Sequence, residues 1–189
     1  MTRDAKIFLS GFAVLATLVV LLPIFVRNPY YLNMFNIVAL HVIVVTGLNL
    51  LIGFAGHISL GHAAFYGLGA YMSSILTTTY GWPAWPTLVL AAVVVGLLAL
   101  IIGIPVLRLK GNYLVMATLG FNIIVGVFLN QMDDLTGGPS GFYGIDPLKI
   151  FGYSLNTDLK FYCLVWPMAL LGLILARNLI HSRAGRGLR

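Results

Sequence analysis

Six stretches of about 20 nearly uncharged, apolar residues follow one another along this chain, and they restrict its fold more than any other feature. A helix of about 20 residues crosses the roughly 30 Å hydrocarbon core of a bilayer. Only 8% of the residues are charged and 60% are hydrophobic, which leaves too little charge for the surface of a soluble domain. We therefore predict an all-α, polytopic transmembrane helix bundle that forms one domain over residues 1–189. The predicted spans are 7–26, 33–54, 60–79, 87–107, 113–132 and 161–179.

The first apolar stretch, residues 7–26, follows a short segment that contains Arg3 and Lys6. A signal peptide also begins with basic residues, but its apolar core is about 7 to 15 residues long and ends at a small-residue cleavage site. This stretch is longer, and no clear site of that kind follows it. We interpret it as a retained first transmembrane helix.

The lysines and arginines fall unevenly on the two sides of the predicted membrane. Short basic loops are held in the cytoplasm, so the richer side is the inner one. This rule predicts a cytoplasmic N-terminus and C-terminus, with residues 133–160 as the long external loop. The inner side would hold Arg3, Lys6, Arg108, Lys110, Arg177, Arg183, Arg186 and Arg189, and the outer side Arg27, Lys149 and Lys160.

A glycine-rich passage, residues 47–71, runs from the end of the second span into the third. Gly53, Gly56 and Gly61 fall within nine residues, and each glycine costs a helix about 1 kcal/mol relative to alanine. The passage therefore predicts a helix break, which is either a cytoplasmic turn or a re-entrant segment. Downstream, the small residues Ala63, Gly67, Gly69 and Ser73 predict close helix packing.

Polar residues inside the predicted spans and at the break between two of them form a second pattern. Near the break they are Asn49, His57, Ser59 and His62, and in the fifth span Thr118, Asn122 and Asn130 recur with Gly126 at every fourth residue. Because hydrocarbon leaves polar groups unpaired, such residues face either protein or an aqueous path. We hypothesise that they line a translocation path; packing between helices is the alternative for each single residue.

Enzyme chemistry is not supported by the spacing of these residues. Ser59 misses the G-x-S-x-G nucleophile pattern by one position, and His57 and His62 are five residues apart, with no glutamate in the chain to complete a zinc site. No Walker motif is present, so we expect no ATP hydrolysis by this chain, no cofactor and no metal. A secondary transporter would be expected to carry intramembrane carboxylates, and no aspartate lies inside a predicted span. A purely structural subunit would leave the polar residues unexplained.

Residues 47–65, GLNLLIGFAGHISLGHAAF, resemble the signature of the membrane permease subunits of bacterial branched-chain amino acid ABC transporters. Further blocks of the resemblance follow in order at 67–71, 108–113, 135–141 and 182–189, so that it extends over 37–189. The chain looks more like the larger of the two permease subunits. Related urea or short-chain amide permeases share much of this pattern and remain alternatives.

The resemblance implies a subunit of an inner-membrane importer for Leu, Ile or Val, with residues 133–160 as a periplasmic loop. The implied partners are a second permease subunit, two cytoplasmic ATP-binding subunits and a periplasmic substrate-binding protein. The segment with Arg183, Gly185 and Arg186 resembles the approach to the helix that couples such permeases to the ATPase. Since the sequence stops there, we expect it to be incomplete at its C-terminus relative to the family.

Overall fold

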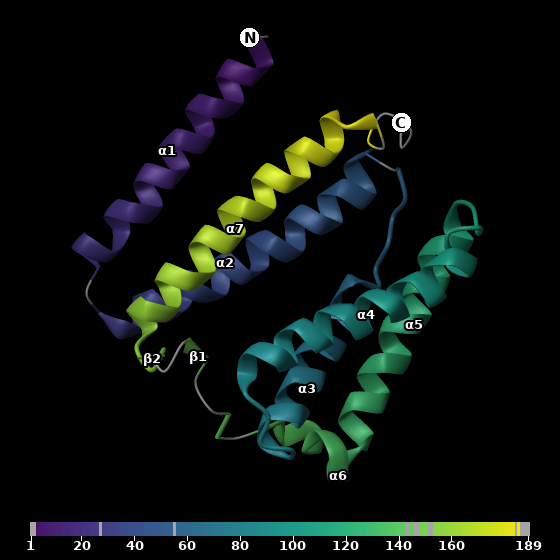
Figure 1. Ribbon diagram of the computed structural model, residues 1–189. Coiled ribbons are helices and arrows are strands. Elements are labelled where there is room, and N and C mark those ends of the chain that lie inside the picture. The colour runs from purple at the N-terminus through teal and green to yellow at the C-terminus, as the bar shows by residue number, and fades with distance from the viewer. Residues whose placement is uncertain are drawn as a thin grey trace.

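The structure is a computed structural model that describes residues 3–26, 28–54, 56–142, 144–145, 148–150, 153–183 and 185. It is built almost wholly of helices, with one two-residue antiparallel strand pair in the long connection (Figure 1). The elements are α1 (Arg3–Phe25), α2 (Pro29–Asn49) with a π-helical turn (Leu50–Phe54), α3 (His62–Thr78), α4 (Ala84–Val106), α5 (Asn112–Gln131), α6 (Asp133–Thr136), a 3-10 turn (Gly138–Ser140), β1 (Lys149–Ile150), β2 (Tyr153–Ser154) and α7 (Asp158–His181).

The predicted fold class is confirmed, and a helix lies at each of the six predicted spans. In the described part of the chain, four helices are long and apolar enough to cross a membrane by themselves: Pro29–Phe54, Ala84–Val106, Asn112–Gln131 and Asp158–His181. α3 is shorter, with 17 residues, because the chain before it is not helical. α1 has 23 residues, and within the part of it whose side chains are described the apolar helix is Leu9–Phe25.

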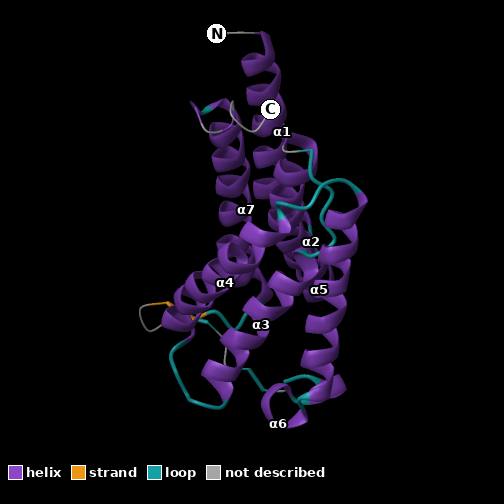
Figure 2. Ribbon diagram, turned by 90° about the vertical axis from the view of Figure 1, so that its right-hand side faces the viewer, coloured by secondary structure: helices purple, strands orange, loops and turns teal. Residues whose placement is uncertain are grey.

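The helices form two groups. In the first, α2 and α7 pack along each other in the same direction and α1 lies against α7; in the second, α3 packs on α4 and α5. The two groups are in contact where α2 meets α3, and α4 also meets β1 in the connection that leads to α7. α1 begins and α7 ends towards the same side of the molecule, while α6 lies at the opposite end (Figures 1 and 2).

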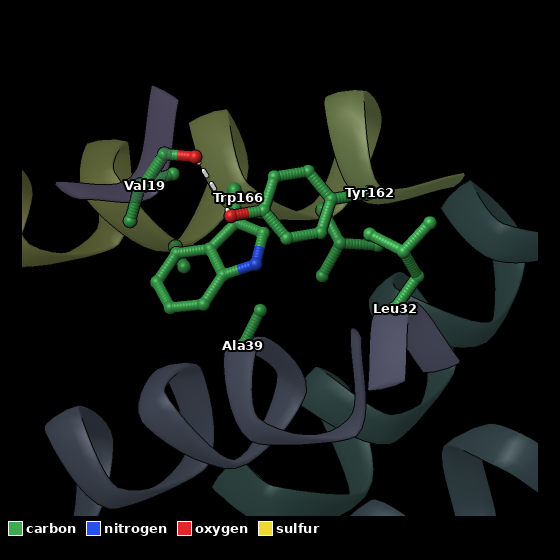
Figure 3. Close-up of a cluster of buried hydrophobic side chains, with 7 residues drawn as sticks. Val19, Leu32, Ala39, Tyr162 and Trp166 are labelled. Atoms are coloured by element: carbon green, nitrogen blue, oxygen red, sulfur yellow. Dashed lines mark hydrogen bonds between the residues drawn. The ribbon is translucent and has the colours of Figure 1, made fainter. Parts of the chain in front are cut away.

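The buried core lies in the first group, between α1, α2 and α7 (Figure 3). Ala39 is 0% exposed and sits opposite Trp166, whose ring lies 5.8 Å from that of Tyr162. Small residues at such contacts let helix backbones approach closely, which is the main source of packing energy in a bilayer. The cluster consists of Val19, Leu32, Ala39, Tyr162, Val165, Trp166 and Ala169.

Pro23 leaves a backbone carbonyl of α1 without its helical hydrogen bond, and α7 supplies the missing donor. Proline has no backbone N–H, so Pro23, which lies inside α1, cannot donate the usual helical hydrogen bond to the carbonyl of Val19. The hydroxyl of Tyr162 donates to that carbonyl oxygen instead, at 2.8 Å. An unpaired carbonyl is costly where no water reaches, so this bond fixes the position of α1 against α7.

The long connection between α5 and α7 holds α6, the 3-10 turn and the strand pair. Its first turn is organised by Thr136, which is 2% exposed. The Thr136 hydroxyl lies 2.6 Å from the Leu129 carbonyl oxygen and 2.8 Å from that of Met132, and it accepts from the Gly138 N–H. These bonds attach the connection to the end of α5.

Candidate functional site at the helix break

The predicted break is confirmed, and its geometry follows from the glycines. α2 widens into the π-helical turn Leu50–Phe54, and residues 56–61 are then non-helical. The His57 N–H donates to the Leu51 carbonyl at 3.2 Å and closes the turn. Gly56 has φ +65°, in the left-handed region that side chains disfavour. A Cβ at Gly53 would lie 2.7 Å from the Asn49 side-chain oxygen, so Asn49 folds over this glycine.

The non-helical segment is held by α5. The Leu60 N–H donates to the Thr118 hydroxyl at 3.1 Å, and the Gly61 N–H donates to the Ser59 hydroxyl at 3.3 Å. Gly61 is buried, and a Cβ on it would lie 3.5 Å from the Thr118 carbonyl oxygen. A residue outside a helix can cover up to about 3.3–3.6 Å and a helical one covers 1.5 Å, so the non-helical segment carries the chain back from the end of α2 to the start of α3 in few residues (Figure 1).

The small residues of α3 face its neighbours, as predicted for three of the four. A Cβ at Gly67 would lie 3.4 Å from Leu129 of α5, and one at Gly69 would lie 3.9 Å from Val95 of α4. The Ser73 and Thr87 hydroxyls are 3.4 Å apart across α3 and α4. Ala63, by contrast, is exposed.

A cavity of about 340 Å³ lies between the break and the facing ends of α3, α4 and α5. That volume falls within the range of small-molecule sites, which are mostly apolar with a few polar groups. Here the polar side chains come from the break, α3 and α5, and the remaining wall is apolar. The lining residues are Leu51, His57, Ser59, Gly61, His62, Phe65, Ala99, Ile102, Gly103, Val106, Leu107, Leu114, Thr118 and Phe121.

Four of the seven residues predicted for the path meet at this cavity: His57, Ser59, His62 and Thr118. The other three do not line it. Asn49 is exposed beside Gly53, Asn122 is half-buried and Asn130 is exposed.

The stripe along α5 separates for a geometric reason. Each step of four residues turns a helix about 40° past a full circle, so Asn130 points about 120° away from Thr118. Two residues four positions apart therefore lie on nearly the same face of a helix, whereas residues twelve positions apart lie on different faces.

The apolar wall contains the residues that sequence reasoning missed. Phe65 and Phe121 stack at 5.1 Å between ring centroids, and Ala99 and Gly103 come from α4. α4 is apolar all round, so no periodicity marks the face that lines the cavity. The other missed contact is Gly47, whose Cβ, if present, would lie 3.6 Å from the His62 Nε2 atom. The His62 ring therefore lies against α2 at Gly47.

The predicted coupling residues lie just after α7. Arg183 is exposed, whereas Gly185 is buried and its N–H donates to the Ser182 hydroxyl at 3.2 Å. A Cβ on Gly185 would collide with the carbonyl oxygen of Leu179, so this position requires glycine as the chain now folds. Arg186 lies outside the described residues.

Comparison with known proteins identifies the family. A family described as the permease component of the branched-chain amino acid transport system matches residues 30–189. Two relatives are named high-affinity branched-chain amino acid transport system permease protein LivM. The one from Salmonella typhimurium is 37% identical over 121 residues, which cover 64% of this chain and 28% of the relative. The one from Escherichia coli is 35% identical over 159 residues, which cover 84% of this chain and 36% of the relative.

The chain therefore spans about a third of the length of the curated relatives that it matches. No solved structure matches it. A match over residues 30–189 covers most of the chain, including the break, the cavity and α7. The chain belongs to the family of branched-chain amino acid transport permease components.

Proposed function

We propose that this chain forms part of a permease subunit of an ATP-binding-cassette importer that moves Leu, Ile or Val across the inner membrane. The observation that carries the proposal is the cavity at the helix break, in a chain of this family. A branched-chain amino acid has an apolar side chain at one end and an ammonium and a carboxylate at the other. The cavity offers a large apolar wall and a small group of polar side chains, which suit these two ends.

The polar end of the substrate would meet His57, Ser59, His62 and Thr118. They come from the break, from the first residue of α3 and from α5, so movement of α3 relative to α5 would change their spacing. Broken helices near membrane depth serve transporters in this way, because the break supplies hydrogen-bonding groups without a buried charge. Asn49, Asn122 and Asn130 remain predicted path residues outside this cavity.

The proposed assembly has a second permease subunit, two cytoplasmic ATP-binding subunits that hydrolyse the ATP, and a periplasmic binding protein. Arg183, Gly185 and Arg186 would contact the ATP-binding subunits. The topology proposed is cytoplasmic at both termini, with residues 133–160 in the periplasm. It is supported by α1 beginning and α7 ending on one side, with α6 at the opposite end (Figure 1).

Uptake of radiolabelled leucine by cells with the full-length permease and its partner subunits tests this proposal. We expect Ser59→Ala and His62→Ala to lower uptake several-fold while the ATP-binding subunits still co-purify. Thr17→Ala is the matched control, because it removes a hydroxyl from an exposed position on α1, far from the cavity. Unchanged uptake in both cavity variants would reject the cavity as the path.

Competition separates the substrate classes. Unlabelled isoleucine and valine should reduce leucine uptake, whereas urea and acetamide should not, because a largely apolar wall gains little from them. If urea competes and isoleucine and valine do not, the protein is a urea or amide permease instead. The absence of co-purified ATP-binding subunits would contradict the importer as a whole.

A further inference from the structure

A second pocket, of about 480 Å³, lies at the junction of α4 and α5 and next to the break. One side is the connection between the two helices, residues 107–112, and the other is residues 56–58. The proposed substrate path does not require this pocket, yet the two cavities share the side chains of His57, Leu107 and Leu114.

The electrostatics of this pocket favour an anion. Arg108 and Lys110 line it, both are exposed, and neither side chain makes a hydrogen bond or an ion pair within the described residues. None of the side chains known to surround it is acidic. The start of α5 adds to the positive potential, because no side chain caps its first amides and Gly111 precedes it with φ +58°.

The location of the pocket favours a lipid over a soluble anion. Five residues, 107–111, join α4 to α5, and both helices are long enough to span the membrane. The connection must therefore lie at the membrane surface, at the level of the phosphates. Beside the two cations, Tyr113 is 74% exposed, and one turn into each helix Ile104 and Met116 are exposed. A soluble phosphate makes no contact with such apolar side chains, whereas the acyl chains of a lipid pack against them.

We propose that this pocket binds the phosphate of an anionic phospholipid, with Arg108 and Lys110 as its charged contacts. Basic pockets between transmembrane helices are suited to such headgroups. The lipid would touch both the α4–α5 connection and the break, so it would hold the edge of the adjoining cavity. This site is independent of what the cavity transports.

The test is lipid binding by the purified full chain, with any partner subunits that accompany it, measured by native mass spectrometry. The probes are short-chain phosphatidylglycerol, short-chain phosphatidylcholine and inorganic phosphate. We expect phosphatidylglycerol to bind preferentially with one molecule per chain. The double variant Arg108→Gln/Lys110→Gln should weaken that binding about tenfold, since each cation near a bilayer surface contributes a severalfold preference.

Lys160→Gln is the matched control, because it removes a cation from the first turn of α7, away from this pocket. It should leave phosphatidylglycerol binding unchanged. Equal binding of the two lipids, or an unchanged affinity in the double variant, would overturn the proposal. Full competition by inorganic phosphate at equal concentration would show a free-ion site instead. Loss of the ATP-binding subunits with lipid binding intact would show a protein contact.

Discussion

The two helix groups are similarly apolar, but the helices of the first pack closely and those of the second leave a cavity. Where α1, α2 and α7 meet, Ala39 and Ala169 let the helices close until Tyr162 and Trp166 are almost fully buried. Where α3, α4 and α5 meet, Gly53, Gly56 and Gly61 end a helix, and a cavity of about 340 Å³ remains. Alanine lets two intact helices approach each other closely, whereas closely spaced glycines interrupt the helix. A pattern of small residues therefore predicts close helix packing where the residues are alanines, and a helix break beside a cavity where they are closely spaced glycines.

Polar side chains also differ between the groups. In the first, the Tyr162 hydroxyl and the Asn36 amide donate to backbone carbonyls on other helices, at 2.8 and 3.1 Å. In the second, the Thr118 hydroxyl accepts from the amide of Leu60, next to the cavity. Bonds of the first kind are shielded from water, and those of the second kind can be replaced by water. Loss of a bond should therefore be more costly in the first group.

The largest difference should come from one substitution made in both groups. Ala39→Phe places a large ring where the side chain is 0% exposed, and overpacking of this kind costs about 1–3 kcal/mol. Ala99→Phe instead fills the cavity and should change stability by less than about 0.5 kcal/mol while it abolishes leucine uptake. Unfolding by denaturing detergent, with uptake in parallel, measures both. Equal destabilisation by the two variants would remove the distinction between core and cavity.

A loss of stability of similar size, without a cavity variant to set against it, is expected from Tyr162→Phe. The variant keeps the ring in the core but leaves the Val19 carbonyl without a donor, because Pro23 cannot supply one. A buried unsatisfied group costs about 1–3 kcal/mol, and the same detergent unfolding measures this loss. Tyr31→Phe, at an exposed ring on α2, is the control and should be neutral. If both variants unfold alike, the hydroxyl does not hold α1.

The smallest effect is expected from Thr118→Val, which removes the acceptor for the Leu60 N–H. Hydrogen bonds between transmembrane segments average about 0.6 kcal/mol, and water from the cavity can substitute here. Hydrogen exchange of the Leu60 amide should become about threefold faster, which corresponds to that energy. Thr118→Ser keeps the hydroxyl and should exchange at the original rate. Equal exchange in the two variants would mean that α5 does not fix the break.

The sequence was sufficient for the helices and the break, because both depend on local chemistry. Uninterrupted apolar stretches mark helices in a bilayer, and Gly53, Gly56 and Gly61 mark the break. The site was only partly predictable. His57, Ser59 and His62 lie so close to the break that they meet the cavity together, whereas Asn122 and Asn130 turn away along α5. The wall that α4 contributes was invisible in the sequence, because a helix that is apolar all round gives no sign of which face meets its neighbours.

The bond between Tyr162 and Val19 has a consequence for the order in which the molecule is assembled. The two residues are 143 positions apart, and ribosomes add about 5–20 residues per second. α1 is thus made roughly 7 to 29 s before the side chain that completes its hydrogen bonding. During that time the Val19 carbonyl has no partner from Pro23, and α1 has no fixed place beside α2. α1 therefore reaches its final position last, after α7 has been synthesised and can bind it.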